Sequence, residues 1–122
     1  MRDRTGGVII NIGSGASKVP FANLASYTAS KGAIEMFTRV AAIELGPHKV
    51  RVNCVAPGVT ATPMLREPMA DGAHRARMED AALLGRIAEP REIAEAIVWL
   101  LSPRASFVEG ETLTVDGGLM LD

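Results

Sequence analysis

Short apolar runs alternate with longer stretches of helical periodicity along this chain of 122 residues. Residues 8–12 form a nearly continuous β-branched run, which is typical of a strand buried on both faces of a parallel sheet. Residues 25–45 have a helical period instead. The apolar residues that fall on one side of this predicted helix are Ile34, Phe37, Val40, Ala41 and Leu45. Gly46 and Pro47 predict its end, because glycine suits a helix C-cap and proline often follows it.

The second half of the chain continues with elements of the same kinds. Residues 50–56 predict a second strand, so the chain begins with a βαβ unit, whose crossover should be right-handed. Residues 59–73 are irregular, and a helix is expected over residues 73–84. Another helix is expected over residues 90–101, where proline stands in the first turn. Residues 112–115 predict a third strand.

The order of these elements predicts how the chain is organised. We expect a single domain over residues 1–122 with the order β-α-β-α-α-β, three parallel strands and helices on both faces, which is an α/β architecture. In open sheets of this kind, ligands bind beyond the carboxyl ends of the strands. Ser14 follows the first strand and Thr62 the second, while Tyr27 and Lys31 begin the helix between them. We therefore expect these side chains to converge at one end of the sheet.

Tyr27 and Lys31 are four residues apart, so a helix places their side chains on one face. A tyrosine with an ordinary pKa of about 10 is a poor acid or base at neutral pH. A nearby ammonium group favours tyrosinate, and acid–base catalysis works best when the pKa lies near the operating pH. The pair can therefore move a proton, with the Ser14 hydroxyl binding the oxygen that gains or loses it. The plain structural alternative is two neighbours on a half-exposed helix face.

The composition argues against several classes of protein. With a net charge of −1, 4% aromatic residues and no basic stripe, the chain does not have the character of a nucleic-acid-binding protein. No apolar run approaches the roughly 20 residues of a membrane span, so no membrane partner is expected. Cys54 is the single cysteine, which excludes an internal disulfide. It lies in an apolar run and is interpreted as a core residue, and a reducing, cytoplasmic location is expected.

Two other kinds of catalytic site are weaker hypotheses. Ser14 and Lys18 suggest a serine–lysine hydrolase, but their spacing differs from Ser-x-x-Lys, and Pro20 disfavours a helix there. His48 and His74 have no second ligand at a spacing that suits a metal ion, so no metal site is expected.

Four segments of the chain resemble the classical short-chain dehydrogenase/reductase family, and together they extend over essentially its whole length. They read Gly-Val-Ile-Ile-Asn-Ile-Gly-Ser at 7–14, Tyr-Thr-Ala-Ser-Lys at 27–31, Arg-Val-Asn-Cys-Val-Ala-Pro-Gly at 51–58 with Thr-Pro-Met at 62–64, and Val-Asp-Gly-Gly at 115–118. Any one segment is weak evidence, but four in this order and spacing are specific. The resemblance implies a partial Rossmann-like, doubly wound parallel sheet.

The resemblance also implies an activity, which is hydride transfer between NAD or NADP and a small carbonyl compound or secondary alcohol. Ser14 would polarise the substrate oxygen, Tyr27 would be the general acid or base, and Lys31 would support the tyrosinate and bind the nicotinamide ribose. The implied cofactor-binding residues are Tyr27, Lys31, Pro57, Gly58, Val59 and Thr62. Residues 63–84 resemble the substrate-binding lid of the family. The lid side chains that suggest an apolar pocket are Met64, Leu65, Met69 and Met78.

The chain departs from the family pattern on its N-terminal side. The glycine-rich turn for the pyrophosphate, the Asn-Asn-Ala-Gly segment and a helix asparagine are not found. We therefore expect the C-terminal, catalytic half of the fold, with an open apolar edge on the strand at 8–12. We also expect self-association, as a dimer or tetramer, through residues 25–45 and 90–118. The competing hypothesis is a truncated, catalytically incompetent chain that acts by pairing with a related chain.

Overall fold

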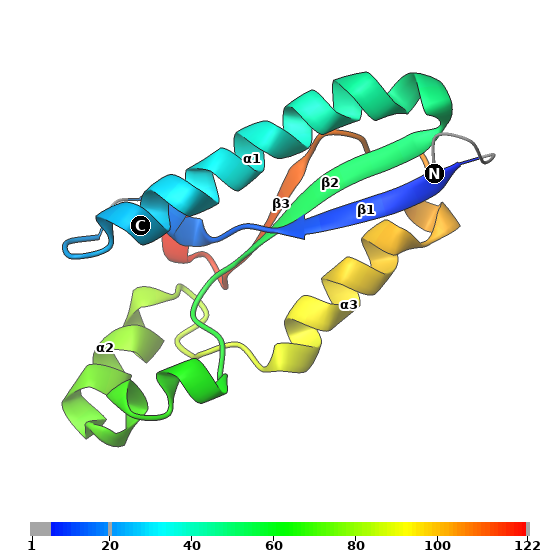
Figure 1. The fold of residues 1–122 in the computed structure, drawn as a ribbon. Helices are drawn as coiled ribbons and strands as arrows, with labels where there is room; N and C mark the ends of the chain where they lie inside the picture. Colours follow the sequence, from blue (N-terminus) through cyan, green and yellow to red (C-terminus); the bar gives the residue numbers. More distant parts are fainter. Residues whose placement is uncertain (1–5, 20, 122) are drawn as a thin grey trace.

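A parallel three-stranded sheet with helices on both faces forms the structure, a computed structural model that describes residues 6–19 and 21–121. The strand order is β1 (Gly7–Ile12), β2 (Val50–Pro57) and β3 (Thr112–Val115). Figure 1 shows α1 (Ala25–Leu45) along one face and α3 (Pro90–Leu101) along the other, with α2 (Gly72–Ala81) beyond the carboxyl ends of the strands. This arrangement confirms the predicted α/β, partial Rossmann-like fold.

The central strand β2 is buried on both sides because its side chains alternate between two apolar clusters. The cluster under α1 contains the buried residues Ala41, Ala42, Val50 and Val52. The cluster under α3 contains the buried residues Val55, Ile93, Leu100 and Ala105. Adjacent positions of β2 thus contribute to opposite faces, which explains why the strand is a nearly continuous apolar run.

Helix α1 contacts the sheet through small side chains. Its buried residues are Thr38, Ala41 and Ala42. Two of the apolar residues that were expected on one side of this helix are largely exposed, Phe37 at 62% and Val40 at 46%. Small residues let the helix axis lie close to the strands, and in that orientation the larger apolar side chains point away from the sheet.

The end of α1 was predicted correctly, since the helix ends at Leu45 with Gly46 as its C-cap, whereas the predicted end of α2 was wrong. Gly46 keeps a right-handed helical conformation and donates its N–H to Ala42, and Lys49 is the residue that takes the left-handed conformation, with φ of 60°. Helix α2 ends at Ala81 rather than at Leu84. The reason is a tertiary contact, because the N–H of Leu84 donates to the carbonyl of Gly117 at 3.1 Å and holds the chain in a loop.

Side chains complete the hydrogen bonding of β2 where β3 is too short to pair with it. The N–H of Val52 donates to Oε1 of Glu109 at 3.0 Å. The amide group of Asn53 donates to the carbonyl of Val108 and accepts from the N–H of Glu111, both at 2.9 Å. The N–H of Val52 and the side-chain amide of Asn53 therefore have partners in the loop before β3.

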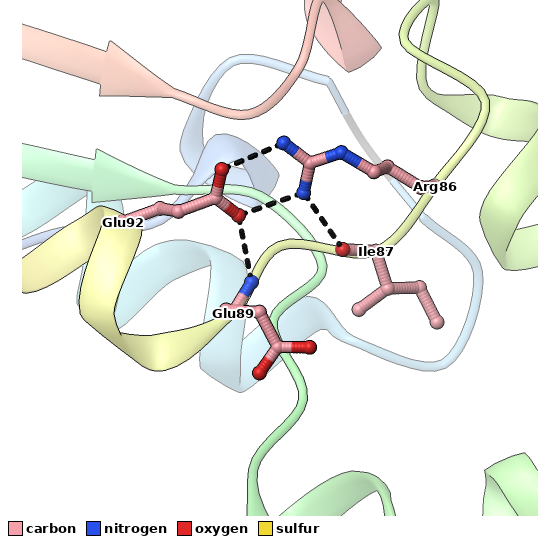
Figure 2. Close-up of polar contacts among 4 residues, drawn as sticks. All are labelled: Arg86, Ile87, Glu89 and Glu92. Atoms are coloured by element: carbon pink, nitrogen blue, oxygen red, sulfur yellow. Dashed lines mark hydrogen bonds and ion pairs between the residues drawn. The ribbon is translucent and has the colours of Figure 1, made fainter.

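The start of α3 is fixed by an ion pair between Arg86 and Glu92 (Figure 2). Arg86 donates two hydrogen bonds to the carboxylate, at 2.7 and 2.6 Å, and Glu92 also accepts from the N–H of Glu89 at 2.9 Å. Hydrogen bonding from Arg86 lowers the pKa of Glu92 to about 2 and raises the pKa of Arg86 itself. Pro90 occupies the first turn of the helix, as the sequence predicted.

The end of α3 is capped from the sheet. Nη2 of Arg51 donates to the carbonyl oxygens of Leu100 and Ser102, at 2.9 and 3.2 Å. The last carbonyls of a helix have no partner within the helix, and this cationic donor from β2 satisfies the carbonyl of Leu100 and that of Ser102 just beyond the helix. Arg51 thereby connects the central strand to the helix that covers it.

Strand β1 forms one edge of the sheet. Its register with β2 runs from the pair of Gly7 and Val50 to the pair of Ile12 and Val55, and no strand among the described residues pairs with its other side. This confirms the expected open edge. In the described part of the chain, no helix has the length and apolar character that crossing a membrane requires.

Candidate active site

Ser14 lies directly after β1 on a backbone that is held from two sides. It caps a short 3₁₀ turn, Gly15–Ser17, and its Oγ accepts from the N–H of Ala16 at 3.2 Å. The hydroxyl of Ser17 donates to the carbonyl of Ser14 at 2.6 Å and also to the carboxylate of Glu35 in α1. The Ser14 hydroxyl is therefore held by the turn that it caps, and the Ser14 carbonyl is connected through Ser17 to Glu35 of α1.

Tyr27 and Lys31 stand in the first turns of α1, next to the end of β1. Nζ of Lys31 donates to the carbonyl oxygen of Ile12 at 3.1 Å. The same nitrogen lies 5.7 Å from the centroid of the Tyr27 ring, within the range of a cation–π contact. The lysine thus contacts both the tyrosine and the strand that leads to Ser14.

The loop after β2 runs close to the end of β3. A Cβ on Gly58 would lie 2.7 Å from Cα of Asp116, so only glycine fits this approach. The carbonyl of Val59 accepts from the N–H of Ala88 at 3.0 Å, which fixes the loop against the segment before α3. Thr62 precedes a 3₁₀ turn, and its side chain makes no capping hydrogen bond there.

A cleft of about 690 Å³ lies at this end of the sheet. All seven predicted site residues line it: Ser14, Tyr27, Lys31, Pro57, Gly58, Val59 and Thr62. Residues that are far apart in the sequence therefore meet in one cavity beyond the carboxyl ends of β1 and β2, as the topology predicted.

The cleft is also lined by residues that were not predicted from the sequence. The missed lining residues include Phe21, Leu24, Thr60, Leu119 and Met120. Of the four apolar lid residues, Met69 was predicted wrongly, because it faces a separate hollow, whereas the other three line the cleft. The sequence did contain a sign that the chain turns before Met120, because an aspartate followed by two glycines predicts a tight turn.

The alternative chemistries receive no support from the geometry. Lys18 points toward β3, where its Nζ donates to Oγ1 of Thr114 at 2.9 Å, so it is engaged away from the Ser14 hydroxyl. Pro20, which disfavoured a helix after Ser14, lies outside the described residues. Across residues 6–19 and 21–121, no group of three or more His, Cys, Asp and Glu side chains could hold a metal ion.

Cys54 is a fully buried free thiol on the α1 side of β2. Burial raises the pKa of the Cys54 thiol, and the nearby Glu35 carboxylate acts in the same direction. A Cβ on Gly13 would lie 2.9 Å from its sulfur, so the thiol is tightly packed. The interpretation of this cysteine as a core residue is confirmed.

Comparison with known proteins agrees with this geometry. A family model described as "Enoyl-(Acyl carrier protein) reductase" matches residues 1–120. A solved structure described as a "short chain dehydrogenase/reductase family protein" is 43% identical, with a TM-score of 0.91 over 100% of this chain and 49% of its own. The chain belongs to the short-chain dehydrogenase/reductase family. The resemblance that the sequence motifs suggested is confirmed.

Members of the short-chain dehydrogenase/reductase family with different names match at similar levels. L-xylulose reductase of Bos taurus is 44% identical over 114 residues, which are 93% of this chain and 47% of that protein. Cyclopentanol dehydrogenase of Comamonas testosteroni is 44% identical over 119 residues, 97% of this chain and 47% of that protein. The structure of a gluconate 5-dehydrogenase from Burkholderia cenocepacia J2315, in complex with NADP and tartrate, has a TM-score of 0.95 and 33% identity over 99% of this chain and 48% of its own. The chain thus spans about half the length of the relatives that it matches.

Proposed function

We propose that this chain is the catalytic part of an NAD(P)-dependent dehydrogenase or reductase that acts on a small carbonyl compound or secondary alcohol. The observation that carries the proposal is the meeting of Ser14, Tyr27 and Lys31 with the loop after β2 in one cleft. Membership of the family supports it, as do relatives named L-xylulose reductase and cyclopentanol dehydrogenase.

In the proposed reduction, the π bond of the carbonyl breaks while a C–H bond and an O–H bond form. The hydride, with both electrons, would come to the carbonyl carbon from a bound nicotinamide. Tyr27 donates its phenolic proton to the carbonyl oxygen, and the Ser14 hydroxyl donates a hydrogen bond to the same oxygen. The Lys31 ammonium stabilises the tyrosinate that remains, and the tyrosine, which is 39% exposed, regains a proton from solvent. Oxidation of an alcohol follows these steps in reverse.

The donors at this end of the sheet fit a nicotinamide dinucleotide. Nζ of Lys31 lies at the cleft, and the Thr62 hydroxyl is not used as a helix cap. An ammonium group and a hydroxyl are suitable donors to ribose hydroxyls and phosphate oxygens. The backbone of Pro57, Gly58 and Val59 would hold the nicotinamide end. The proposal covers NAD and NADP alike.

Titration of the purified chain with NADH and NADPH, followed by nicotinamide fluorescence, tests the cofactor part of the proposal. Saturable binding would support the proposal, and Lys31→Ala should weaken it about tenfold, because a charge-assisted hydrogen bond is lost. Lys18→Ala is the matched control, since that lysine is exposed and contacts Thr114 instead of lining the cleft. Equal affinities for the two variants would remove Lys31 from the cofactor site.

The Tyr27→Phe variant tests the acid–base role of Tyr27. Turnover is measured as the loss of NADH absorbance in the presence of a ketone. The variant keeps the ring and removes only the proton donor. We expect turnover to fall about 10²–10⁴-fold while the affinity for NADH stays near that of the unchanged protein. Undiminished turnover would contradict the assignment.

Self-association through residues 25–45 and 90–118 is a further part of the proposal. The large apolar side chains exposed on the outer side of α1 are Met36, Phe37, Val40 and Ile43. Those exposed on and after α3 are Val98, Trp99, Leu101 and Phe107. Contiguous exposed apolar surface is typical of interaction sites. The second candidate function, a catalytically incompetent chain that pairs with a related chain, draws on the same surfaces and on the open edge of β1.

Sedimentation velocity over a range of concentrations distinguishes these possibilities. Phe37→Glu combined with Ile43→Glu should shift the protein toward the monomer, whereas Ala76→Glu on the exposed side of α2 should not. A monomer at every concentration would contradict self-association. Association without any binding of NADH or NADPH would favour the pairing function. We also propose a cytoplasmic location, which the buried free thiol of Cys54 supports.

A further inference from the structure

The lining of the cleft is apolar apart from a few side chains. Besides Ser14, Tyr27 and Lys31, its polar side chains are the hydroxyls of Thr60 and Thr62. The hydroxyl of Thr60 is already engaged, since it donates to the carbonyl of Gly58 at 3.1 Å. Among the described residues, no side chain that carries a carboxylate, amide, imidazole or guanidinium group lines the cleft. The bulky apolar side chains that line it include Phe21, Met64, Leu65, Met78 and Met120.

One of these walls comes from a turn after β3 that is organised by Asp116. Its two carboxylate oxygens accept from the N–H of Gly118 at 3.0 Å and from the N–H of Met120 at 2.9 Å. Gly117 and Gly118 take the positive φ values, 63° and 86°, that the turn requires. The turn is therefore held by its own aspartate, and it places Met120 at the cleft.

Met120 packs directly against the residue that follows Ser14. A Cβ on Gly15 would lie 2.7 Å from Cε of Met120 and 3.4 Å from its sulfur. Gly15 thus provides the space that the methionine side chain occupies, and both residues line the cleft. The width of the cavity next to the catalytic serine depends on this contact.

We propose that the cleft takes an apolar ketone or secondary alcohol, with one oxygen for Ser14 and Tyr27 and no further hydroxyls, and that Met120 determines specificity by limiting the width beside Ser14. The inference rests on the proposed function and names its substrate class. A substrate with many hydroxyls would need a polar partner for each one on burial, and the lining offers too few.

Direct binding tests this inference without cofactor or turnover. Saturation-transfer NMR on the purified chain would compare 4-tert-butylcyclohexanol with inositol, since both are six-membered rings and only one is polyhydroxylated. We expect binding of the first and none of the second. Met120→Gln keeps the length of the side chain and makes it polar, and it should weaken binding of the apolar alcohol about tenfold. Met69→Gln is the matched control, because Met69 belongs to the lid but faces a different hollow.

Three outcomes would overturn the inference. The chain could bind inositol with an affinity similar to that for 4-tert-butylcyclohexanol, or it could bind neither compound. Alternatively, the Met120→Gln and Met69→Gln variants could bind 4-tert-butylcyclohexanol with equal affinity. If Met120→Gln does not fold, as judged by circular dichroism, Gly15→Ala replaces it. Its added methyl would displace the end of Met120, so the same loss of affinity is expected, and unchanged affinity would overturn the inference. Failure of the proposed function is distinguishable, because it appears in the NADH titration and in Tyr27→Phe turnover.

Discussion

Gly58 is the position where a single added methyl group should disturb both the sheet and the site. The new Cβ would lie 2.7 Å from Cα and from Cβ of Asp116, and 3.2 Å from its carbonyl oxygen. Two of these three atoms belong to the backbone, so no side-chain rotation relieves the overlap. The ends of β2 and β3 must separate where the N–H of Gly58 donates to the carbonyl of Val115 at 2.9 Å.

The magnitude follows from these contacts. Overpacking costs about 1–3 kcal/mol, and loss of the backbone hydrogen bond adds about 1 kcal/mol. We therefore expect Gly58→Ala to lower the free energy of unfolding by about 2–4 kcal/mol, a large share of the total of about 5–15 kcal/mol typical of a folded domain. With a urea m-value of about 1–3 kcal/mol per molar, the unfolding midpoint should fall by about 1 M or more.

Urea unfolding followed by circular dichroism measures this effect, and Gly46→Ala provides a control of opposite sign. Gly46 has a helical φ of −54° and no atom within 4 Å of an added Cβ. Alanine should stabilise that position by about 0.5–1 kcal/mol, because glycine loses more backbone freedom on folding. A midpoint for Gly58→Ala equal to that of the unchanged protein would refute the close approach between the loop after β2 and the end of β3.

Three further perturbations test contacts outside the cleft. Arg51→Ala should lower the free energy of unfolding by about 1–3 kcal/mol, measured by urea unfolding, because the carbonyls of Leu100 and Ser102 lose their donor. An unchanged midpoint would contradict this capping role. Folding lowers the pKa of Glu92 from 4.5 to about 2, so its ion pair stabilises the protein above pH 4.5, and this contribution is lost as the pH falls toward 2. Arg86→Met should flatten this part of the curve of stability against pH, and an unaltered curve would show that the pair is not formed. Cys54 should resist iodoacetamide at pH 8 in the native protein and react once urea unfolds the chain. The reason is that burial raises the pKa of the thiol and excludes the reagent. Rapid alkylation of the native protein, detected by mass spectrometry, would show that the thiol is accessible.

The order of elements and the strand positions could be predicted from the sequence because they depend on local patterns. The β-branched run at 8–12 and the apolar run at 50–56 correspond to β1 and β2 within one residue at each end. Pro90 also began the helix that its backbone favours. The orientation of α1 could not be predicted in the same way. Its rotation is set by how closely Thr38, Ala41 and Ala42 approach the strands, and Phe37 is left exposed as a result.

The positions of the site residues could be predicted because parallel strands bring their carboxyl ends together. Ser14 and the residues after Gly58 follow strand ends, so the topology alone places them near each other. Met120 could not be placed in this way. Its position depends on a local turn held by Asp116 and on a gap at Gly15, and the second contact joins residues far apart in the sequence.

Asp116 contacts both the proposed cofactor loop and the wall of the substrate cleft, but through different atoms. A substitution at this position can therefore affect one of them and leave the other unchanged. Its Cα and Cβ pack against Gly58, which leads into the proposed cofactor loop, whereas its carboxylate holds the N–H of Met120 in the wall of the substrate cleft. Asp116→Ala removes the carboxylate and keeps the Cβ. We therefore expect weaker binding of 4-tert-butylcyclohexanol, by about tenfold, and unchanged affinity for NADH in the fluorescence titration. Loss of NADH binding with full retention of alcohol binding would contradict this division, because it would mean that the carboxylate supports the loop after β2 and leaves the Met120 wall in place.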